Sequence, residues 1–200
     1  MQGKDMFLKK NRVLSFLIII FFINNIAYAD TNSKNRIINY LENLNNMSVS
    51  FLQNDGNEMS GGEISIGKKR VRVDYKNPSR ILIVLDEDKA MYYNYDLDED
   101  EFFDPRDTAA WFFFDIFKNI DFLIDAEISI AENNIILTKS GKTDLDFYVL
   151  TLFFEDNPLV IRKIKLKLNE NFIIFSIYDH NFNKNFSEDF FKLINPNFFN

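Results

Sequence analysis

The chain contains no cysteine, which excludes disulfides, thiolate catalysis and anchoring to a membrane through a lipid-modified N-terminal cysteine. It has a single histidine, His180, which cannot form a histidine cluster and has no cysteine to pair with, so we expect neither a metal site nor a histidine-based nucleophile system. The six glycines form no phosphate-binding loop. We therefore expect a binding protein rather than an enzyme, with no cofactor and no metal.

Carboxylates are plentiful, and residues 96–101 place aspartates at alternate positions, as a calcium-binding loop does. The sixth position of that loop is Glu101 where a glycine is needed, and the twelfth is Asp107 where a glutamate is needed. A solvated hairpin tip is the favoured interpretation. A secreted hydrolase that uses these carboxylates is kept only as a remote alternative, because no base, nucleophile or metal set accompanies them.

The N-terminus has the three parts of a secretory signal peptide. Lys9, Lys10 and Arg12 are followed by an apolar run over 13–23 and by the small-x-small sequence at 27–29. The alternative, an uncleaved anchor, is disfavoured because about 20 apolar residues are needed to span a bilayer. The sequence predicts a signal peptide over 1–29, a single domain over 30–200 and export to the periplasm.

The net charge of the whole chain is −7. The expected signal peptide holds four basic residues and one acidic residue, so the remainder is near −10. An acidic protein repels nucleic acid and anionic lipid headgroups. We therefore expect a monomer that binds no nucleic acid and that meets lipid, if at all, in an enclosed apolar site.

Hydrophobic periodicity predicts one helix over 32–47 and then a long series of strands. Short turns between the strands favour antiparallel neighbours. The predicted strands cover 63–66, 70–75, 81–85, 91–95, 127–130, 135–138, 147–154, 161–168 and 172–178. Alternation predicts that one set of side chains points into a common apolar space: Ile64, Ile66, Val73, Tyr75, Ile83, Met91 and Tyr93.

A second helix is predicted over 109–120, after Pro105 and a cap at Asp107 or Thr108. Its apolar side chains cover an arc of about 200° at about 100° per residue, and Trp111 lies outside even that arc. A surface helix needs an apolar stripe only somewhat wider than 100°. Composition alone favours a core helix over one that lines a ligand cavity.

The order of several short motifs resembles that of the periplasmic outer-membrane lipoprotein carrier family, LolA. A strand with Phe51 and Gln53 is followed by Gly62 with alternating apolar residues, by Arg72 and Tyr75, and at the end by Phe191 and Pro196. The resemblance spans most of the chain after the signal peptide. Two motifs depart from the family pattern: residues 67–70 lack its proline, and residues 86–88 lack its glycine.

The resemblance implies a mainly β fold with helices, an incomplete antiparallel β-barrel whose helical lid covers an apolar cavity. It implies a periplasmic carrier that shields the acyl chains of lipoproteins on the way from the inner to the outer membrane. The implied partners are acylated lipoproteins and the inner-membrane lipoprotein-releasing ABC transporter, with or without an outer-membrane receptor. A half-barrel that senses envelope lipids or lipoproteins is the alternative.

The resemblance also implies that the second helix is the lid. It therefore favours a helix that lines a ligand cavity over a core helix. The expected lid side chains facing the lipid are Trp111, Phe112, Phe114 and Phe117. A basic residue that fixes the lid is implied at the cluster Lys68, Lys69 and Arg70. The alternative for this cluster is a solvated strand end, where lysine and arginine discourage edge-to-edge pairing.

Overall fold

The computed structural model describes residues 31–143, 147–187 and 189–199, so the expected signal peptide over 1–29 lies outside the described residues. The chain divides into two compact units, residues 1–37 and 38–200, and each is described by itself. In the first unit, residues 31–37 are helical, and in the second the helix continues to residue 42. This helix ends five residues earlier than the sequence predicts, because Asn46 adopts a positive φ of 58° and the first strand begins at Met47.

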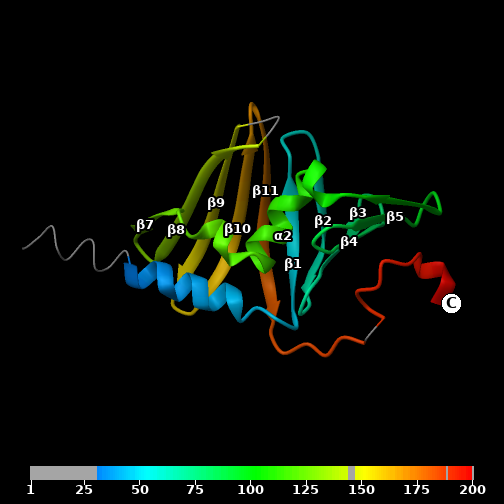
Figure 1. The fold of residues 1–200 in the computed structure, drawn as a ribbon, viewed down its shortest axis with the longest axis horizontal. Coiled ribbons are helices and arrows are strands. Elements are labelled where there is room, and N and C mark those ends of the chain that lie inside the picture. The colour runs from blue at the N-terminus through cyan, green and yellow to red at the C-terminus, as the bar shows by residue number, and fades with distance from the viewer. Residues whose placement is uncertain (1–30, 144–146, 188, 200) are drawn as a thin grey trace, which may run out of the picture. The chain divides into compact units, whose positions relative to one another are not determined.

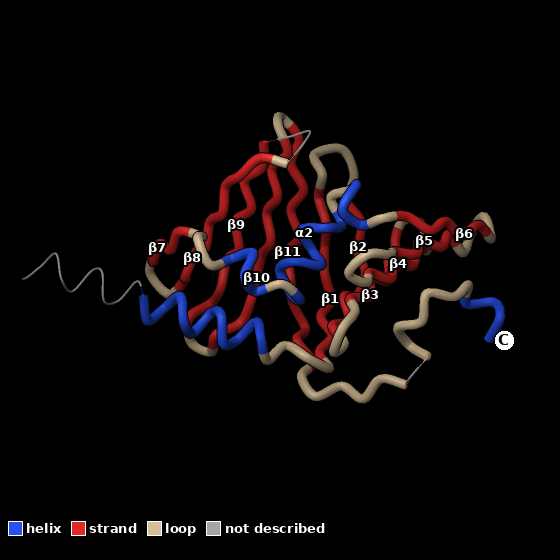
Figure 2. The backbone as a smooth tube through the Cα atoms, in the orientation of Figure 1, coloured by secondary structure: helices blue, strands red, loops and turns tan. Residues whose placement is uncertain are grey.

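Within the described part of the second unit, eleven strands form one antiparallel sheet, and two helical segments, residues 38–42 and 110–118, lie against it (Figures 1 and 2). None of the described helices is long and apolar enough to cross a membrane. The strands are β1 (Met47–Asn54), β2 (Met59–Ile66), β3 (Val71–Asn77), β4 (Ile81–Leu85), β5 (Ala90–Asn94), β6 (Glu99–Phe103), β7 (Glu127–Ala131), β8 (Asn134–Lys142), β9 (Phe147–Asp156), β10 (Leu159–Leu168) and β11 (Asn171–Asn181). The helical segments after the first strand are α2 (Ala110–Lys118) and the short turns η1 (Pro105–Asp107), η2 (Ile120–Leu123) and η3 (Pro196–Phe199).

The strand order is β6-β5-β4-β3-β2-β1-β11-β10-β9-β8-β7. Two meanders, β1 to β6 and β7 to β11, join where β1 pairs with β11. The chain leaves the first meander at β6 and enters the second at β7, and these are the two edge strands of the sheet. The connection over 104–126 must therefore cross the width of the sheet, and it carries η1, α2 and η2 across one face.

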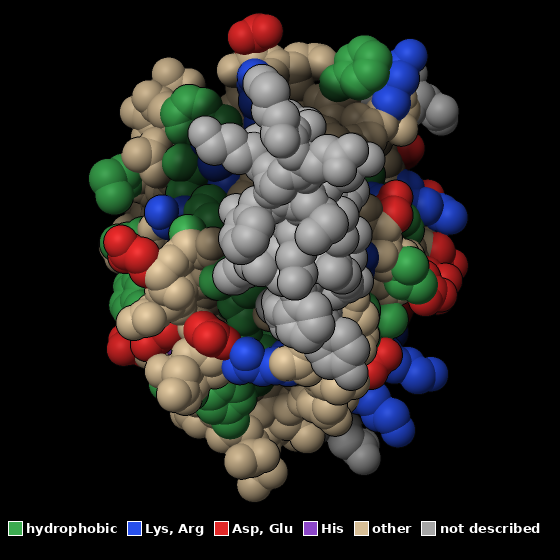
Figure 3. All heavy atoms as spheres, turned by 90° about the vertical axis from the view of Figure 1, so that its left-hand side faces the viewer, with side chains coloured by type: hydrophobic (Ala, Val, Ile, Leu, Met, Phe, Trp, Pro, Cys, Tyr) green, Lys and Arg blue, Asp and Glu red, His purple; other side chains and the backbone are tan. Residues whose placement is uncertain are grey.

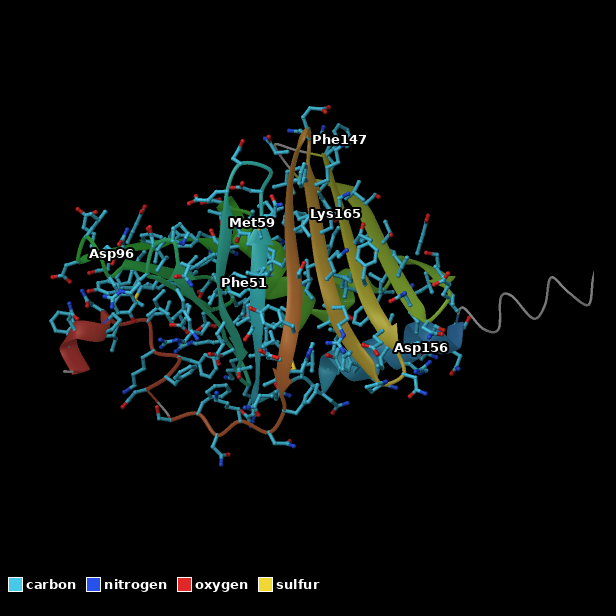
Figure 4. All side chains as sticks on the ribbon, turned by 180° about the vertical axis from the view of Figure 1, so that it is seen from behind. Phe51, Met59, Asp96, Phe147, Asp156 and Lys165 are labelled. Atoms are coloured by element: carbon cyan, nitrogen blue, oxygen red, sulfur yellow. The ribbon has the colours of Figure 1, made fainter. Side chains whose placement is uncertain are left out.

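Cross-strand pairs assign each residue to one of the two faces, because residues directly opposite each other share a face. Val73 pairs with Ile64 and Ile83 on the face that α2 covers, here called the inner face. Arg72 pairs with Ser65 and Val84 on the other, outer face. Figure 1 shows α2 in front of the sheet, and Figure 4 shows it behind the sheet when seen from the outer face. The hydrophobic core lies on the inner face.

The predicted mainly β fold class is confirmed, and each predicted strand is found within one or two residues or as part of a longer strand. Hydrophobic periodicity did not predict two of the strands: β1, which only the family resemblance indicated through Phe51 and Gln53, and β6. Residues 99–103 form the edge strand β6, although all but Phe103 are exposed and three of the five are acidic. No alternation of buried and exposed residues marks this strand, so only pairing with β5 reveals it. The acidic run at 96–101 is accordingly the turn before β6 and its beginning.

Candidate functional site

An apolar pocket of about 160 Å³ lies between the inner face of the sheet and the start of α2. Strands β1, β3, β4 and β11 form its floor, and the helical connection forms its roof. Eight of its ten lining side chains are apolar. They are Gln53, Val73, Tyr75, Ile83, Leu85, Ala109, Ala110, Phe113, Ile173 and Phe175.

The roof of the pocket differs from the predicted one. Ala109 and Ala110 face the pocket together with Phe113 because they lie four and three residues before it, on the same side of the helix. The ring of Phe113 packs edge-on against Phe175, with 4.4 Å between centroids. Phe113 was absent from the predicted set, although its place in the apolar arc gave the same signal as its neighbours.

The four predicted lid residues pack elsewhere. Phe112 meets the rings of Phe122 and Tyr148, with centroids 6.2 and 4.8 Å away. Trp111 stacks on Phe114 at 6.3 Å, and Phe117 is buried. None of them lines the pocket in this closed arrangement. A helix surrounded by the sheet on one side and by η2 on another buries most of its circumference, so burial alone could not show which residues face the pocket.

Five of the seven predicted strand residues share the inner face. Val73, Tyr75 and Ile83 line the pocket, and Ile64 and Ile66 lie beside them by register, fully buried. The prediction for Met91 and Tyr93 is wrong, because Ile83 pairs with Tyr92 across the four-residue loop between β4 and β5. Because residues 92 and 93 are both tyrosine, the alternation pattern did not show which of them points to the inner face.

Met91 and Tyr93 instead belong to an apolar cluster with Leu82 and Val84 on the outer face, and Leu193 of the C-terminal segment packs on that cluster. Polar contacts tie the same segment to the sheet. Asn197 Nδ2 donates to the Tyr93 hydroxyl at 2.8 Å, and Tyr93 in turn donates to Asp98 at 2.7 Å, a bond that raises the pKa of Tyr93 to about 12. The C-terminal residues therefore cover a surface that the sequence interpretation assigned to the cavity.

The predicted latch cluster does not contact α2. Lys68 and Lys69 are exposed and have no hydrogen-bond or ion-pair partner among the residues that the structure describes. Arg70 donates to Asp86 at 2.6 Å and to the Phe191 carbonyl at 3.0 Å. It therefore fixes the C-terminal segment on the outer face and not the helix on the inner face.

The basic residue that joins the helix to this loop comes from the helix itself. Lys118, in the last turn of α2, donates through Nζ to the carbonyl of Gly67 between β2 and β3. Burial lowers the pKa of Lys118 to about 8. Only Asp115 and Lys118 are charged among the nine residues of α2, which is the one sequence signal that could have identified this contact.

Asp115 is buried within the same helix, with 1% of its surface exposed. Burial raises its pKa to about 6, and a hydrogen bond from Asn119 Nδ2 at 3.1 Å offsets part of that effect. Helix α2 thus holds one buried acid and one partly buried base, each with its pKa moved toward neutrality by desolvation.

Two polar side chains mark one end of the pocket. The Tyr75 hydroxyl donates to Gln53 Oε1 at 2.7 Å, and burial raises the pKa of Tyr75 to about 12. The amide nitrogen of Gln53 has no hydrogen-bond partner within the described residues, so it is available to an acceptor in the pocket.

A larger hollow of about 440 Å³ lies beneath the C-terminal segment and is lined mainly by charged residues. Its charges are largely paired: Arg72 bonds Asp74 at 2.7 Å, and Lys76 approaches Glu63 at 3.3 Å. The smaller inner pocket is the better candidate site because a helix roofs it and apolar side chains line it. The described residues contain no group of three His, Cys, Asp or Glu side chains that could hold a metal.

Comparison with known proteins identifies distant relatives. No protein-family model matches the chain. An uncharacterized protein of Rickettsia prowazekii (strain Madrid E) is 26% identical over 200 residues, which covers 94% of this chain and 90% of that protein.

Among solved structures, an uncharacterized conserved protein from Thermus thermophilus gives a TM-score of 0.52 at 12% identity, over 80% of this chain and 92% of that one. MucB of Pseudomonas aeruginosa, solved with MucA, gives 0.46 at 13% identity over 80% and 59% of the two chains. LprF from Mycobacterium bovis gives 0.41 at 7% identity over 80% and 98%. The Thermus structure shows a shared fold, and the lower scores add nothing to that conclusion.

Proposed function

We propose that this protein is a periplasmic carrier that holds the acyl chains of lipoproteins between α2 and the inner face of the sheet. The observation that carries the proposal is the pocket itself: eight apolar side chains of ten, beneath a helix that is apolar on most sides. Each methylene removed from water is worth about 0.8 kcal/mol. Lipoprotein acyl chains must therefore be shielded during transfer, and an apolar site that can open supplies the shielding.

The closed pocket is smaller than the roughly 300–1,000 Å³ that ligand sites usually offer. Loading therefore requires α2 to move away from the sheet. Displacing α2 would expose the buried rings of Phe112, Phe113 and Phe117 to the entering chains. The aromatic residues predicted as lid contacts would then meet lipid in the open state while packing on protein in the closed one.

The proposed route begins at an inner-membrane lipoprotein-releasing ABC transporter and ends at the outer membrane, with or without a receptor there. Export would follow cleavage after Ala29, which N-terminal sequencing of the exported protein would test. Recovery of a protein that still contained residues 13–23 would contradict the cleaved signal. The proposal is one of binding and transfer, with no catalytic step.

Site-specific photo-crosslinking tests the cargo and the site together. A photoreactive phenylalanine analogue at Phe113 should capture an acylated lipoprotein in the periplasm. The same analogue at Phe102 is the matched control, because Phe102 is an exposed aromatic residue on the edge strand β6. Native mass spectrometry of the uncrosslinked protein should show the same acylated species. Equal capture at both positions, or a protein free of lipid in both experiments, would remove the basis of the proposal.

A further inference from the structure

The outer face of the sheet carries a row of lysines that the net charge of −7 does not suggest. Lys163, Lys165 and Lys167 occupy alternate positions of β10, so all three point to one side of the sheet. Each of them is exposed, while Ile164 and Leu166 between them are buried on the inner face. Figure 4 shows this surface, with Lys165 on β10 near its centre.

The neighbours of these lysines are apolar or uncharged. Register places Phe172 opposite Lys167 and Ile174 opposite Lys165 on β11. On β9, Val149, Thr151 and Phe153 stand opposite the same three lysines. Lys163 and Lys142 place their amino groups 5.2 and 5.3 Å from the rings of Phe153 and Phe147.

This lysine–aromatic surface is defined here as the outward positions of β11 from Phe172 to Tyr178, of β10 from Lys163 to Lys167, of β9 from Phe147 to Phe153, and of β8 from Ile136 to Lys142. It holds four lysines and no carboxylate among those described positions. The nearest outward acid on β9, Glu155, is paired with Arg162 at 2.6 Å. Seen from the β7 side of the molecule, acidic and basic side chains are both present on the visible surface (Figure 3).

Large apolar side chains are exposed at one end of the surface. Phe147 is 67% exposed and Met59, on β2, is 62% exposed, and Phe172 lies at the same end beside the turn at Gly56. Figure 4 places Phe147 above Lys165 and Met59 to one side. Aromatic residues beside lysines are the combination that binds an anionic bilayer surface, where rings enter the interface and ammonium groups meet phosphates.

We infer that the lysine–aromatic surface docks on an anionic phospholipid membrane. The overall negative charge does not prevent this, because charges more than about 10 Å away are screened at moderate salt while a local cluster still acts. Acidic side chains in the bordering turns, Asp55, Glu58 and Glu170, confine the contact to the strand face. The inference concerns the opposite face from the pocket and stands or falls independently of acyl binding.

Vesicle flotation tests the inference with the full exported chain. Binding is measured to phosphatidylcholine vesicles with and without phosphatidylglycerol, at low and high salt. We expect binding only with phosphatidylglycerol and mainly at low salt. Each lysine near such a surface contributes about fivefold in affinity, or about 1 kcal/mol, so Lys165→Gln with Lys167→Gln should weaken binding about 25-fold. Phe147→Ser should weaken it as well.

The control is Lys68→Gln with Lys69→Gln, which changes the net charge equally at exposed positions elsewhere. It should bind as the parent does. Equal weakening by the two double variants would show a net-charge effect and overturn the assignment. Equal binding to vesicles with and without phosphatidylglycerol would also overturn it. So would a failure of the parent protein to bind either kind of vesicle. Circular dichroism confirms that each variant is folded.

Discussion

The rings of Phe51 and Tyr75 meet edge to face, 5.1 Å between centroids, across the glycine that separates them in the sheet. Register places Gly62 on β2 directly between Phe51 on β1 and Tyr75 on β3. A Cβ at position 62 would meet the backbone of Asp74 and Tyr75 on the neighbouring strand. Three residues from three separate sequence motifs thus form a single row on the inner face, and that row positions Tyr75 at the pocket.

Replacement of Gly62 by alanine should be strongly destabilising. A Cβ at this position would lie 2.0 Å from the backbone oxygen of Asp74, and backbone cannot yield as a flexible side chain does. We expect a loss of several kcal/mol in the free energy of unfolding or a failure to fold, as overpacking in a rigid site produces. Chemical denaturation followed by tyrosine and tryptophan fluorescence measures it.

Gly61→Ala is the matched control, because its Cβ would approach only the Leu52 side chain, at 3.3 Å, more closely than an ordinary contact. Its cost should be below about 1.5 kcal/mol, since the leucine can adjust. Similar losses from both substitutions would show that strand propensity, and not the close approach to β3, explains the glycine at position 62.

The sequence predicts much of this row but only part of the pocket. Alternation correctly places Ile64, Val73 and Tyr75 on one face, because each strand there has apolar residues on one side and polar residues on the other. It fails at Met91 and Tyr93, because both alternating sets of β5 contain apolar or aromatic residues and Leu193 covers the outer one. A strand that is apolar on both sides carries no phase information, so only the loop length between β4 and β5 sets its register.

The sequence predicts the helix α2 but not its contacts. A helix apolar over about 200° predicts burial on several sides, but the choice of Phe113 over Phe112 as the pocket residue depends on how the helix is rotated. Lys118 fixes that rotation through a backbone carbonyl at Gly67, which no side-chain pattern reveals. Arg70 also bonds a backbone carbonyl, that of Phe191, so no side-chain pattern shows that the basic cluster at 68–70 meets the C-terminal segment instead of the lid.

Gln53 should select acyl chains that carry a carbonyl group. Its amide oxygen accepts from Tyr75, which leaves the amide N–H groups for an acceptor in an otherwise apolar pocket. Gln53→Leu should lower the affinity for a long-chain acyl ester about 2- to 12-fold, the value of one hydrogen bond of about 0.5–1.5 kcal/mol. Affinity for a hydrocarbon dye of similar size should not fall.

Calorimetric titration of the parent and of Gln53→Leu with both ligands provides the measurement. Gln53→Asn is the comparison variant that keeps the amide but shortens its reach. A parallel loss for ester and hydrocarbon would mean that the substitution damages the pocket as a whole, and the selective role would be abandoned.

Lys118 should make the closed lid easier to open. Its pKa is lowered from 10.5 to about 8 by burial, so the closed state binds fewer protons than the open state between those values. Closure is therefore favoured as the pH rises through about 8 toward 10.5, and it is opposed by the charged ammonium at neutral pH. Binding of an apolar dye to the parent protein should fall as the pH rises through this window.

Lys118→Met should bind less dye than the parent at neutral pH and should lose that pH dependence, because it removes the buried charge but keeps the side chain's apolar length. Lys69→Met serves as the control and should behave as the parent, since Lys69 is exposed in the same turn as Gly67 but is not the residue that Lys118 contacts. Stronger dye binding by Lys118→Met would mean that the bond to Gly67 outweighs the burial of the charge.

Asp115 should impose the opposite pH dependence on the same helix. Burial raises its pKa from 3.8 to about 6, so the closed, folded state binds more protons than the unfolded chain between those values. Asp115 therefore destabilises the folded protein least below about pH 4, and the free energy of unfolding falls as the pH rises from about 4 to 6. Other carboxylates act in the reverse direction, because hydrogen bonds to the backbone and to Arg106 lower the pKa values of Asp55 and Asp104. A pH profile of the parent alone would mix these effects.

The difference between the parent and Asp115→Asn isolates the one group. Asparagine keeps an oxygen that can accept from Asn119 but carries no charge at any pH. The variant should unfold at nearly the parent's temperature at pH 4 and several degrees higher at pH 7, because one pKa unit corresponds to about 1.4 kcal/mol. Thermal unfolding at intervals between pH 4 and 7 gives the difference curve. A difference that stays constant with pH would show that Asp115 ionises in the folded protein as it does in the unfolded chain, and that the closed helix does not desolvate it.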